Sequence, residues 1–281
     1  NEEAGLLMGN LAPLPVTAID LFAGALFPGL LLVFFFIIYI LILSKINPND
    51  LPVIGSKKSR SKIFKNLFMD ILPPIALIFS VLGSIFLGIA TPTESAAVGA
   101  IGALLIAFIK KELSFTKIFD ASITTAKMCS FVFLILIGAS MFSLVFRGFG
   151  GDDMISEFLN DIPGGKFAAL FLVMATIFVL GFFLDYIEII FVIIPLVGPS
   201  LIASGLDPLW LGILISLNLQ TSFLTPPFGF SLFFLRGVAP KNVKTINIYK
   251  GVVPFIFIQI FTIFIVFYFP NIATWLPRLL N

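Results

Sequence analysis

The sequence predicts an all-α polytopic membrane protein. Of its 281 residues, 59% are hydrophobic and only 11% are charged. Several apolar runs approach or exceed the roughly 20 residues that a helix needs to cross a bilayer. The chain has no histidine and a single cysteine, Cys129, which excludes imidazole metal sites, an internal disulfide and a cysteine metal cluster. No basic patch with interleaved aromatic residues indicates a nucleic-acid partner.

Four apolar runs in the first half of the chain predict membrane spans. A polar stretch over 1–20, which we interpret as a truncated start, precedes scaffold-type transmembrane helices over 21–146. The predicted spans are 21–44, 67–90, 95–109 and 126–146. Residues 114–124 place apolar side chains on one helical face, which predicts a short helix at the membrane interface.

The segment Thr91-Pro92-Thr93-Glu94 predicts a capping box at the start of the third span. Thr91 takes the cap position, Pro92 takes the first helical position, and the Glu94 side chain reaches back to the cap. We interpret this motif as structural. The helix that follows carries small residues at a spacing of four, which favours close packing against another helix. These residues are Ser95, Gly99, Ala103 and Ala107.

An acidic loop over 147–166 precedes a long apolar run, 166–204. The two arms of this run, 166–180 and 189–204, extend only about 22–24 Å at 1.5 Å per residue, which is short of a roughly 30 Å hydrocarbon core. The bend over 181–185 has no Lys or Arg, although an inner turn between two full spans is expected to carry basic residues. We therefore favour a re-entrant hairpin over two short spans.

Two acidic residues, Asp185 and Glu188, interrupt this apolar run. Acids inside a membrane segment are costly and are usually functional. Because they are three residues apart, they share a face if both are helical. Asp185, at the predicted tip, is the better functional candidate. Glu188 is explained equally well as a charge that favours the N-terminus of the second arm.

Residues 208–238 are long enough to cross a bilayer, but their centre disfavours a continuous helix. Pro226 and Pro227 have no N–H group, so the carbonyls of Ser222 and Phe223 lose their helical partners. Unpaired carbonyls at membrane depth persist only where protein or a water-filled cavity satisfies them. In transporters, such broken helices bind ions and solute.

The residues next to the two prolines also favour a broken helix. Thr225 precedes a proline and is expected to be extended, and Gly229 tolerates backbone conformations that other residues resist. The alternative is a proline kink patched by Ser222 and Thr225, with Thr225 capping the second half-helix. The two prolines, the glycine and a polar set favour a binding site; that set is Asn218, Gln220, Thr221 and Ser222.

A break of this kind has two opposite ends. The first half-helix points its carbonyl end at the break, which attracts a cation, and the second half-helix presents N–H groups, which attract an anion such as a carboxylate. We expect Na⁺ near Ser222, Phe223 and Thr225 because hard cations prefer oxygen ligands. Asp185 is the nearest full charge by topology.

The basic residues are distributed unevenly among the loops. Loops 45–66, 110–127 and 236–250 carry 6, 4 and 4 of the 17 Lys and Arg residues, which places these loops on the cytoplasmic side. The loop 147–166 and the C-terminus are then extracytoplasmic. The last segment, 241–281, holds the final predicted span, residues 250–273, and the C-terminus.

Three motifs occur in order: GIATPTESA at 88–96, GFFLD at 181–185 and LTPPFG at 224–229. Together they resemble the large membrane subunit of TRAP transporters, the DctM type. The family brings another hairpin and another break before the span equivalent to 21–44, so the resemblance is to its C-terminal portion. The resemblance implies an ion-transporter-like elevator fold built from two inverted repeats, each with a hairpin and a broken helix.

The resemblance also implies a function. It implies a bacterial inner-membrane permease, not an enzyme, that imports organic acids such as dicarboxylates or similar solutes by symport with Na⁺, without another cofactor. The implied partners are a small membrane subunit and a periplasmic solute-binding protein. By motif, 147–240 holds the second-repeat hairpin (166–204) and the broken helix (208–238). The candidate ion- and solute-binding residues are Gly181, Asp185, Asn218, Gln220, Thr221, Ser222, Phe223, Thr225, Pro226, Pro227 and Gly229.

Two other functions fit parts of the sequence. A carrier of the broader ion-transporter class, working without a binding protein, would use the same break. An intramembrane hydrolase would use Asp185 and Glu188 as paired acids, but no second motif supports it. A plain channel is less expected because no ring-forming charged motif lines a pore.

Overall fold

The computed structural model describes most of the chain. The described residues are 16–47, 60–226, 229–240 and 243–280, without the side chains of 60–70 and of Phe230. The regular secondary structure of these residues is entirely helical. The chain divides into a small unit, residues 39–128, and a large unit, residues 1–38 with 129–281. The division falls within two long helices, α2 (Ala18–Ile46) and α5 (Phe115–Gly148).

Five helical segments among the described residues are long and apolar enough to cross a membrane. They are Ala18–Ile46, Pro92–Ile109, Phe115–Gly148, Tyr186–Ala203 and Thr245–Tyr268. A sixth results if α6 (Gly151–Asn160) and α7 (Gly165–Leu180), which are bent by 119°, count as one broken span. The predicted all-α polytopic class is confirmed. The elevator arrangement and the re-entrant course of 166–204 stay predictions.

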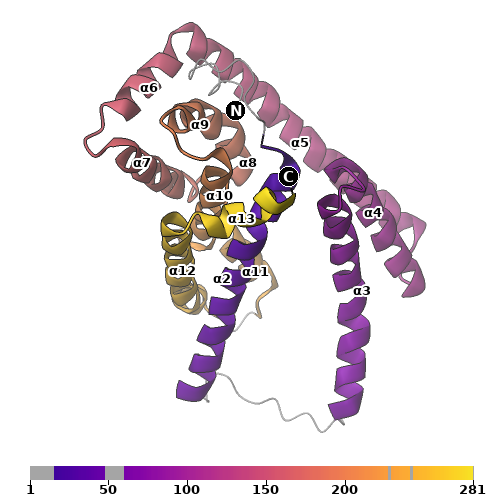
Figure 1. The fold of residues 1–281 in the computed structure, drawn as a ribbon. Helices are drawn as coiled ribbons and strands as arrows, with labels where there is room; N and C mark the ends of the chain where they lie inside the picture. Colours follow the sequence, from indigo (N-terminus) through magenta and orange to yellow (C-terminus); the bar gives the residue numbers. More distant parts are fainter. Residues whose placement is uncertain (1–15, 48–59, 227–228, 241–242, 281) are drawn as a thin grey trace. The chain divides into compact units, whose positions relative to one another are not determined.

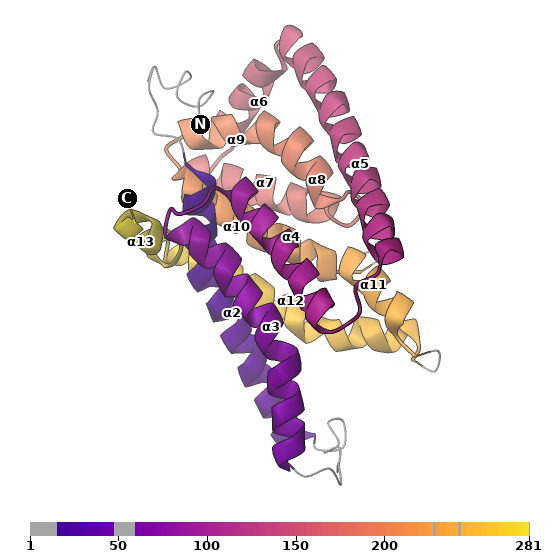
Figure 2. The same ribbon diagram turned by 90° about the vertical axis from the view of Figure 1, so that its right-hand side faces the viewer.

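In the small unit, α3 (Arg60–Phe86) and α4 (Pro92–Ile109) lie side by side (Figure 2). The predicted capping box is confirmed, because the Glu94 N–H donates to Thr91 Oγ1 at 3.3 Å and the Thr91 N–H donates to Glu94 Oε2 at 2.8 Å. The small residues of α4 meet α3, where Ser95 and Ser84 hydrogen-bond at 2.9 Å. The motif therefore starts a helix whose small residues allow close packing.

Helix α5 corrects the expectation of a separate interfacial helix over 114–124. The chain forms one continuous helix of 34 residues from Phe115 to Gly148. The hydroxyls of Ser122, Thr124 and Thr125 each donate to the carbonyl four residues earlier, at 2.8–2.9 Å. Because these polar side chains bond to their own helix, they do not interrupt it.

The predicted acidic loop 147–166 also contains a helix. In α6, Leu159 is buried, and the helix packs against α7 and α9 (Ile194–Ala203). Its first-turn acids favour the helix N-terminus, and Asp152 forms an ion pair with Arg147 at 3.4 Å. Because acidic residues occur throughout this segment, the apolar face of its helix was not recognised from the sequence.

The run 166–204 folds back on itself. After α7 come a short turn, the three-residue α8 (Tyr186–Glu188), a π-helical turn η1 (Ile189–Ile193) and α9. Helices α7 and α9 contact each other. The second arm starts at Tyr186 rather than at the predicted residue 189, so it is longer than the sequence suggested.

The C-terminal span differs from the prediction at its end. Helix α12 runs from Thr245 to Tyr268, and a second helix, α13 (Asn271–Leu280), follows. The predicted span continued to residue 273. Pro270 explains the stop, because the residue before a proline is pushed out of the helical region, and Phe269 accordingly has φ −122° and ψ 72°.

The core of the large unit is built around α10 (Pro208–Leu224). This helix lies between α7 and α12 (Figures 1 and 2). A helix that is apolar on all sides is expected to be buried on all sides. Its buried residues are Leu209, Trp210, Leu211, Ile213, Leu214, Ile215, Leu217, Asn218, Leu219, Thr221 and Ser222. The predicted break therefore follows directly after the helix that forms the core of the large unit.

Candidate functional site

The helix predicted over 208–238 is broken where the sequence indicated. Helix α10 ends at Leu224, and α11 runs from Phe230 to Val238. Thr225 is extended, with φ −95° and ψ 129°, as expected for a residue before a proline. Pro226 lies in the break, and Pro227 lies outside the described residues.

Gly229 occupies a backbone conformation that requires glycine. Its φ is +38° and its ψ is 91°. A Cβ atom at this position would lie 2.9 Å from the Phe223 carbonyl oxygen and 3.0 Å from the Thr225 carbonyl oxygen. Two carbonyl oxygens at and just after the end of α10 therefore lie close to the same point, and only a residue without a side chain allows this approach.

One predicted feature of the break is wrong. The Ser222 carbonyl is not left without a partner, because the Thr225 N–H donates to it at 3.0 Å. The chain tightens by one residue, as helix ends often do, and replaces the bond that Pro226 cannot make. Thr225 Oγ1 donates to the Thr221 carbonyl at 2.8 Å, so a hydroxyl patches the helix end as the kink alternative proposed.

The kink alternative is wrong on its second point, the cap of the second half-helix. Thr225 does not cap the second half-helix, since Gly229 is the residue that precedes α11. No side chain caps α11 among the described residues. Its first N–H groups therefore have no side-chain acceptor and keep the partial positive charge of a helix N-terminus.

The tip of the folded-back run lies against the end of α10. A Cβ atom at Gly181 would overlap the Ser222 side chain, whose Cβ would be 2.7 Å away. Next to this contact, the rings of Tyr186 and Phe223 meet edge to face with centroids 5.9 Å apart. The structure thus brings two predicted motifs together, the GFFLD tip and the proline-marked break.

Asp185 stands beside this contact but is not part of it. It is half-buried and caps α8, with Oδ1 accepting the Tyr186 N–H at 2.7 Å. Its backbone is extended, with ψ 156°, so it does not share a helical face with Glu188. Among the described residues, no hydrogen bond or ion pair joins Asp185 to α10. Glu188 lies in the first turn of α8, as its structural interpretation expected.

The sequence reasoning missed the π-helical turn at Ile189–Ile193. Such turns often occur at functional sites. Ile189 is fully buried, and Pro195 follows two residues after the turn. Since Pro195 cannot donate to the carbonyl four residues earlier, the proline was the available signal for an irregular helix directly after the tip.

The polar residues of α10 divide into two groups. Asn218 is buried, and its Nδ2 donates to the Met174 carbonyl of α7 at 2.8 Å. Thr221 is fully buried, and its hydroxyl donates to the Leu217 carbonyl at 2.8 Å. Gln220, which the sequence reasoning included in the site, is exposed instead. It lies on the side of α10 opposite to the buried polar residues.

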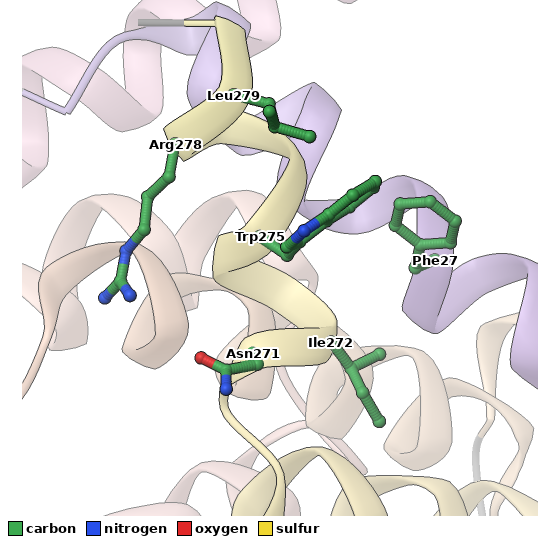
Figure 3. A pocket seen from close by; sticks show the side chains of 6 residues that line it. All are labelled: Phe27, Asn271, Ile272, Trp275, Arg278 and Leu279. Atoms are coloured by element: carbon green, nitrogen blue, oxygen red, sulfur yellow. The ribbon is translucent and has the colours of Figure 1, made fainter.

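Two hollows lie near these helices. One, of about 470 Å³, lies between α7, α10 and α12 and is lined by apolar residues together with Asn218 and Tyr268. The other, of about 800 Å³, lies between α2 and α13, where the Trp275 and Phe27 rings approach each other (Figure 3). Arg278 of α13 pairs with Asp207, before α10, at 3.9 Å. The second hollow therefore lies at the end of α10 away from the break.

Residues 7–272 match the family described as "Tripartite ATP-independent periplasmic transporter, DctM component". The chain belongs to the DctM family. It is 30% identical to the C4-dicarboxylate TRAP transporter large permease protein DctM of Vibrio cholerae, over 92% of this chain and 61% of that protein. It is 29% identical to the ectoine TRAP transporter large permease protein TeaC of Halomonas elongata, over 92% of this chain and 60% of that protein.

A third relative is the sialic acid TRAP transporter permease protein SiaT of Haemophilus influenzae, 29% identical over 77% of this chain and 34% of that protein. The chain spans about a third to three fifths of the length of these DctM-family relatives. The predicted relation to TRAP transporter large permeases is confirmed. So is the expectation of a family of transporters rather than enzymes, since these relatives are permeases.

Proposed function

We propose that the chain forms part of the large permease subunit of a binding-protein-dependent, Na⁺-coupled TRAP transporter. The transporter imports organic acids or similar solutes across a bacterial inner membrane. The observation that carries this proposal is the contact between the Gly181 tip and the Ser222 end of α10, directly before the break. Family membership supports it.

The cation end of the proposed site is the carbonyl end of α10. The carbonyl oxygens of Phe223 and Thr225 face one point at Gly229. Each carbonyl has two lone pairs, so the Ser222 oxygen that accepts from Thr225 can also contact an ion. Oxygen ligands suit Na⁺ as a hard cation, and the helix end adds partial negative charge. Asp185 supplies a full negative charge near the tip.

The anion end of the proposed site is the start of α11. No side chain caps this helix within the described residues, and its N–H groups attract a carboxylate. The three relatives described above are named for C4-dicarboxylates, ectoine and sialic acid, which carry a carboxylate, and a further relative is named for isethionate, which carries a sulfonate. We therefore favour an anionic acid group as the feature that the site recognises, without choosing one solute.

The proposal includes two partner proteins and an orientation. A periplasmic solute-binding protein delivers the solute, and a small membrane subunit accompanies the permease, as family membership suggests. The basic loops face the cytoplasm, and the C-terminus is extracytoplasmic.

Transport in proteoliposomes tests this function. The complete permease is reconstituted with its small subunit and supplied with solute-loaded binding protein, and uptake is compared under inward gradients of Na⁺ and of K⁺. We expect uptake only with the Na⁺ gradient and only with the binding protein. Uptake without the binding protein would favour the carrier alternative. Uptake that ignores the Na⁺ gradient would refute the coupling.

A further inference from the structure

Four polar side chains are buried where α10 and α12 pack together. Asn218 and Gln259 are 5% exposed, and Thr221 and Thr262 are 0% exposed. The neighbouring residues of α12 are apolar, whereas α10 also carries Ser216, Gln220 and Ser222 nearby. Polar groups at membrane depth are costly and usually have a purpose. Gln259 was not among the predicted site residues, because a lone amide in an apolar run gives no periodic signal.

One hydrogen bond and one packing cluster indicate how these antiparallel helices are aligned. Trp210 Nε1 donates to the Val266 carbonyl at 2.8 Å near the start of α10. At the other end, Leu224 packs against a cluster formed by Leu232 of α11 with Ile248 and Val252 of α12. Counted from the Trp210–Val266 bond, seven residues along α10 reach Leu217, and seven residues back along α12 reach Gln259. Because both helices rise by about 1.5 Å per residue, Leu217 and Gln259 lie near the same level.

This register places Gln259 of α12 near the level of Asn218 of α10, and we call Gln259, Asn218 and Thr221 the polar layer. Asn218 follows Leu217 directly, so it is about 1.5 Å from the level of Gln259 along the helix axis. It also shares its hollow with Ile260 and Ile263 of α12, so it borders that helix. Thr221 is one turn further towards the break and shares a helical face with Leu217 and Leu224.

The hydrogen bonds of this layer leave one buried acceptor without a donor among the described residues. The Thr221 hydroxyl donates to the Leu217 carbonyl at 2.8 Å, and Asn218 Nδ2 donates to the Met174 carbonyl at 2.8 Å. Gln259 Oε1 is buried and has no hydrogen-bond partner among the described residues. A buried amide oxygen without a partner is destabilising and uncommon in folded proteins. What this layer offers is neutral oxygen atoms.

We propose that the layer binds a monovalent cation, Na⁺, through Gln259 Oε1, Asn218 Oδ1 and Thr221 Oγ1. A water molecule has only two hydrogens for three oxygens, whereas a hard cation can contact all three. The described residues hold no cluster of three His, Cys, Asp or Glu, so a divalent ion would lack the charge it requires. Na⁺ as the coupling ion rests on the proposed function, but this site is separate from the break.

Thermal unfolding of the purified chain in lipid nanodiscs tests the proposal. NaCl is exchanged for choline chloride at constant ionic strength, so that only the cation changes. A tenfold excess of Na⁺ over its Kd should raise the unfolding midpoint by on the order of 3 °C. The measurement is made in a Gly229→Ala background as well, because the added Cβ disturbs the carbonyl oxygens of the proposed ion contacts at the break.

Gln259→Leu should affect the stability in choline and the Na⁺-dependent shift differently. In choline the variant should be at least as stable as the parent chain, because an amide oxygen without a partner has been removed. Its Na⁺-dependent shift should fall, and in the Gly229→Ala background it should vanish. Ser216→Leu is the matched control, since Ser216 is an exposed residue of α10. It should keep the full Na⁺ shift.

Three results would overturn the inference. They are the absence of a Na⁺ shift in the parent chain, an unchanged shift in Gln259→Leu, and a loss of stability in choline for that variant. If Gln259→Leu does not fold, Thr221→Val removes one ligand at nearly constant volume and should reduce the same shift. Failure here would leave Na⁺-dependent uptake by the complete transporter untouched, so the two proposals fail separately.

Discussion

Replacing Gly229 with alanine should damage the proposed ion site more than any other single methyl group added to the break. The backbone at Gly229 has φ +38°, where a residue with a Cβ is strained. The added atom would also lie 2.9 Å from the Phe223 oxygen and 3.0 Å from the Thr225 oxygen. Both neighbours are backbone atoms, so they cannot rotate away as a flexible side chain would.

The size of the effect follows from this strain. A non-glycine residue in a sparsely populated backbone region costs about 1–3 kcal/mol. If the strain falls on the conformation that binds the ion, the fraction of competent sites falls by roughly 5- to 150-fold. The Na⁺ concentration for half-maximal uptake should rise by a similar factor in the complete transporter. Solute-binding protein docking should not change, because the backbone change is confined to the break.

Gly237→Ala, in the helix that follows Gly229, is the matched control. A Cβ there meets nothing within 4 Å, and its backbone is not in the left-handed region. Alanine in a helix should be neutral or stabilising by up to about 1 kcal/mol. The assay compares the Na⁺ dependence of uptake for both variants. If Gly229→Ala and Gly237→Ala give the same Na⁺ dependence as the parent, the carbonyl oxygens at Gly229 do not bind the ion.

Three further predictions test neighbouring features. Asp185→Asn keeps an oxygen for the Tyr186 N–H but loses the charge, so the Na⁺ requirement of uptake should rise by roughly 10- to 150-fold; an unchanged requirement removes Asp185 from the ion site. Gly181→Ala should lower the unfolding midpoint, since overpacking typically costs about 1–3 kcal/mol, and adding Ser222→Gly should recover part of that loss; equal midpoints for the single and double variants contradict the contact. In a Cys129→Ser background, an impermeant thiol reagent should label Asp153→Cys but not Lys57→Cys in intact cells, and the reverse pattern would invert the orientation.

The features predicted correctly from the sequence depend on local chemistry. A proline lacks its N–H in any context, so the end of α10 near Pro226 and the extended Thr225 followed from the sequence alone. The Thr91–Glu94 capping box is likewise set within four residues. For the same reason, the helix boundary before Pro270 was available as a signal, although the predicted last span ran past it.

The errors arose where one bond could replace another. The Ser222 carbonyl loses the N–H of residue 226 but accepts that of Thr225, because the chain end can tighten. The hydroxyls in α5 bond to their own helix and keep it continuous. A sequence shows which bond is lost, but the replacement depends on backbone geometry that forms only in the folded chain.

Contacts between residues far apart in the sequence could not be predicted from local sequence patterns. Gly181 and Ser222 are 41 residues apart, and the register of α10 against α12 depends on Trp210 reaching the Val266 carbonyl. The position of Gln259 near Asn218 can be inferred only from that register. Gln220 was included in the site because it is polar, but its exposure depends on which face of α10 the neighbouring helices cover.

The end of α10 links the tip, the break and the polar layer through consecutive residues. Thr221 belongs to the polar layer, the Ser222 side chain meets Gly181, and the Phe223 carbonyl faces Gly229. Because packed interiors resist small displacements, a shift at one of these residues is passed to its neighbours rather than absorbed. A cation that draws these oxygens together therefore acts on the contact with the tip as well. This proximity gives a physical route by which ion binding can bias the position of the tip, and hence the solute end of the break.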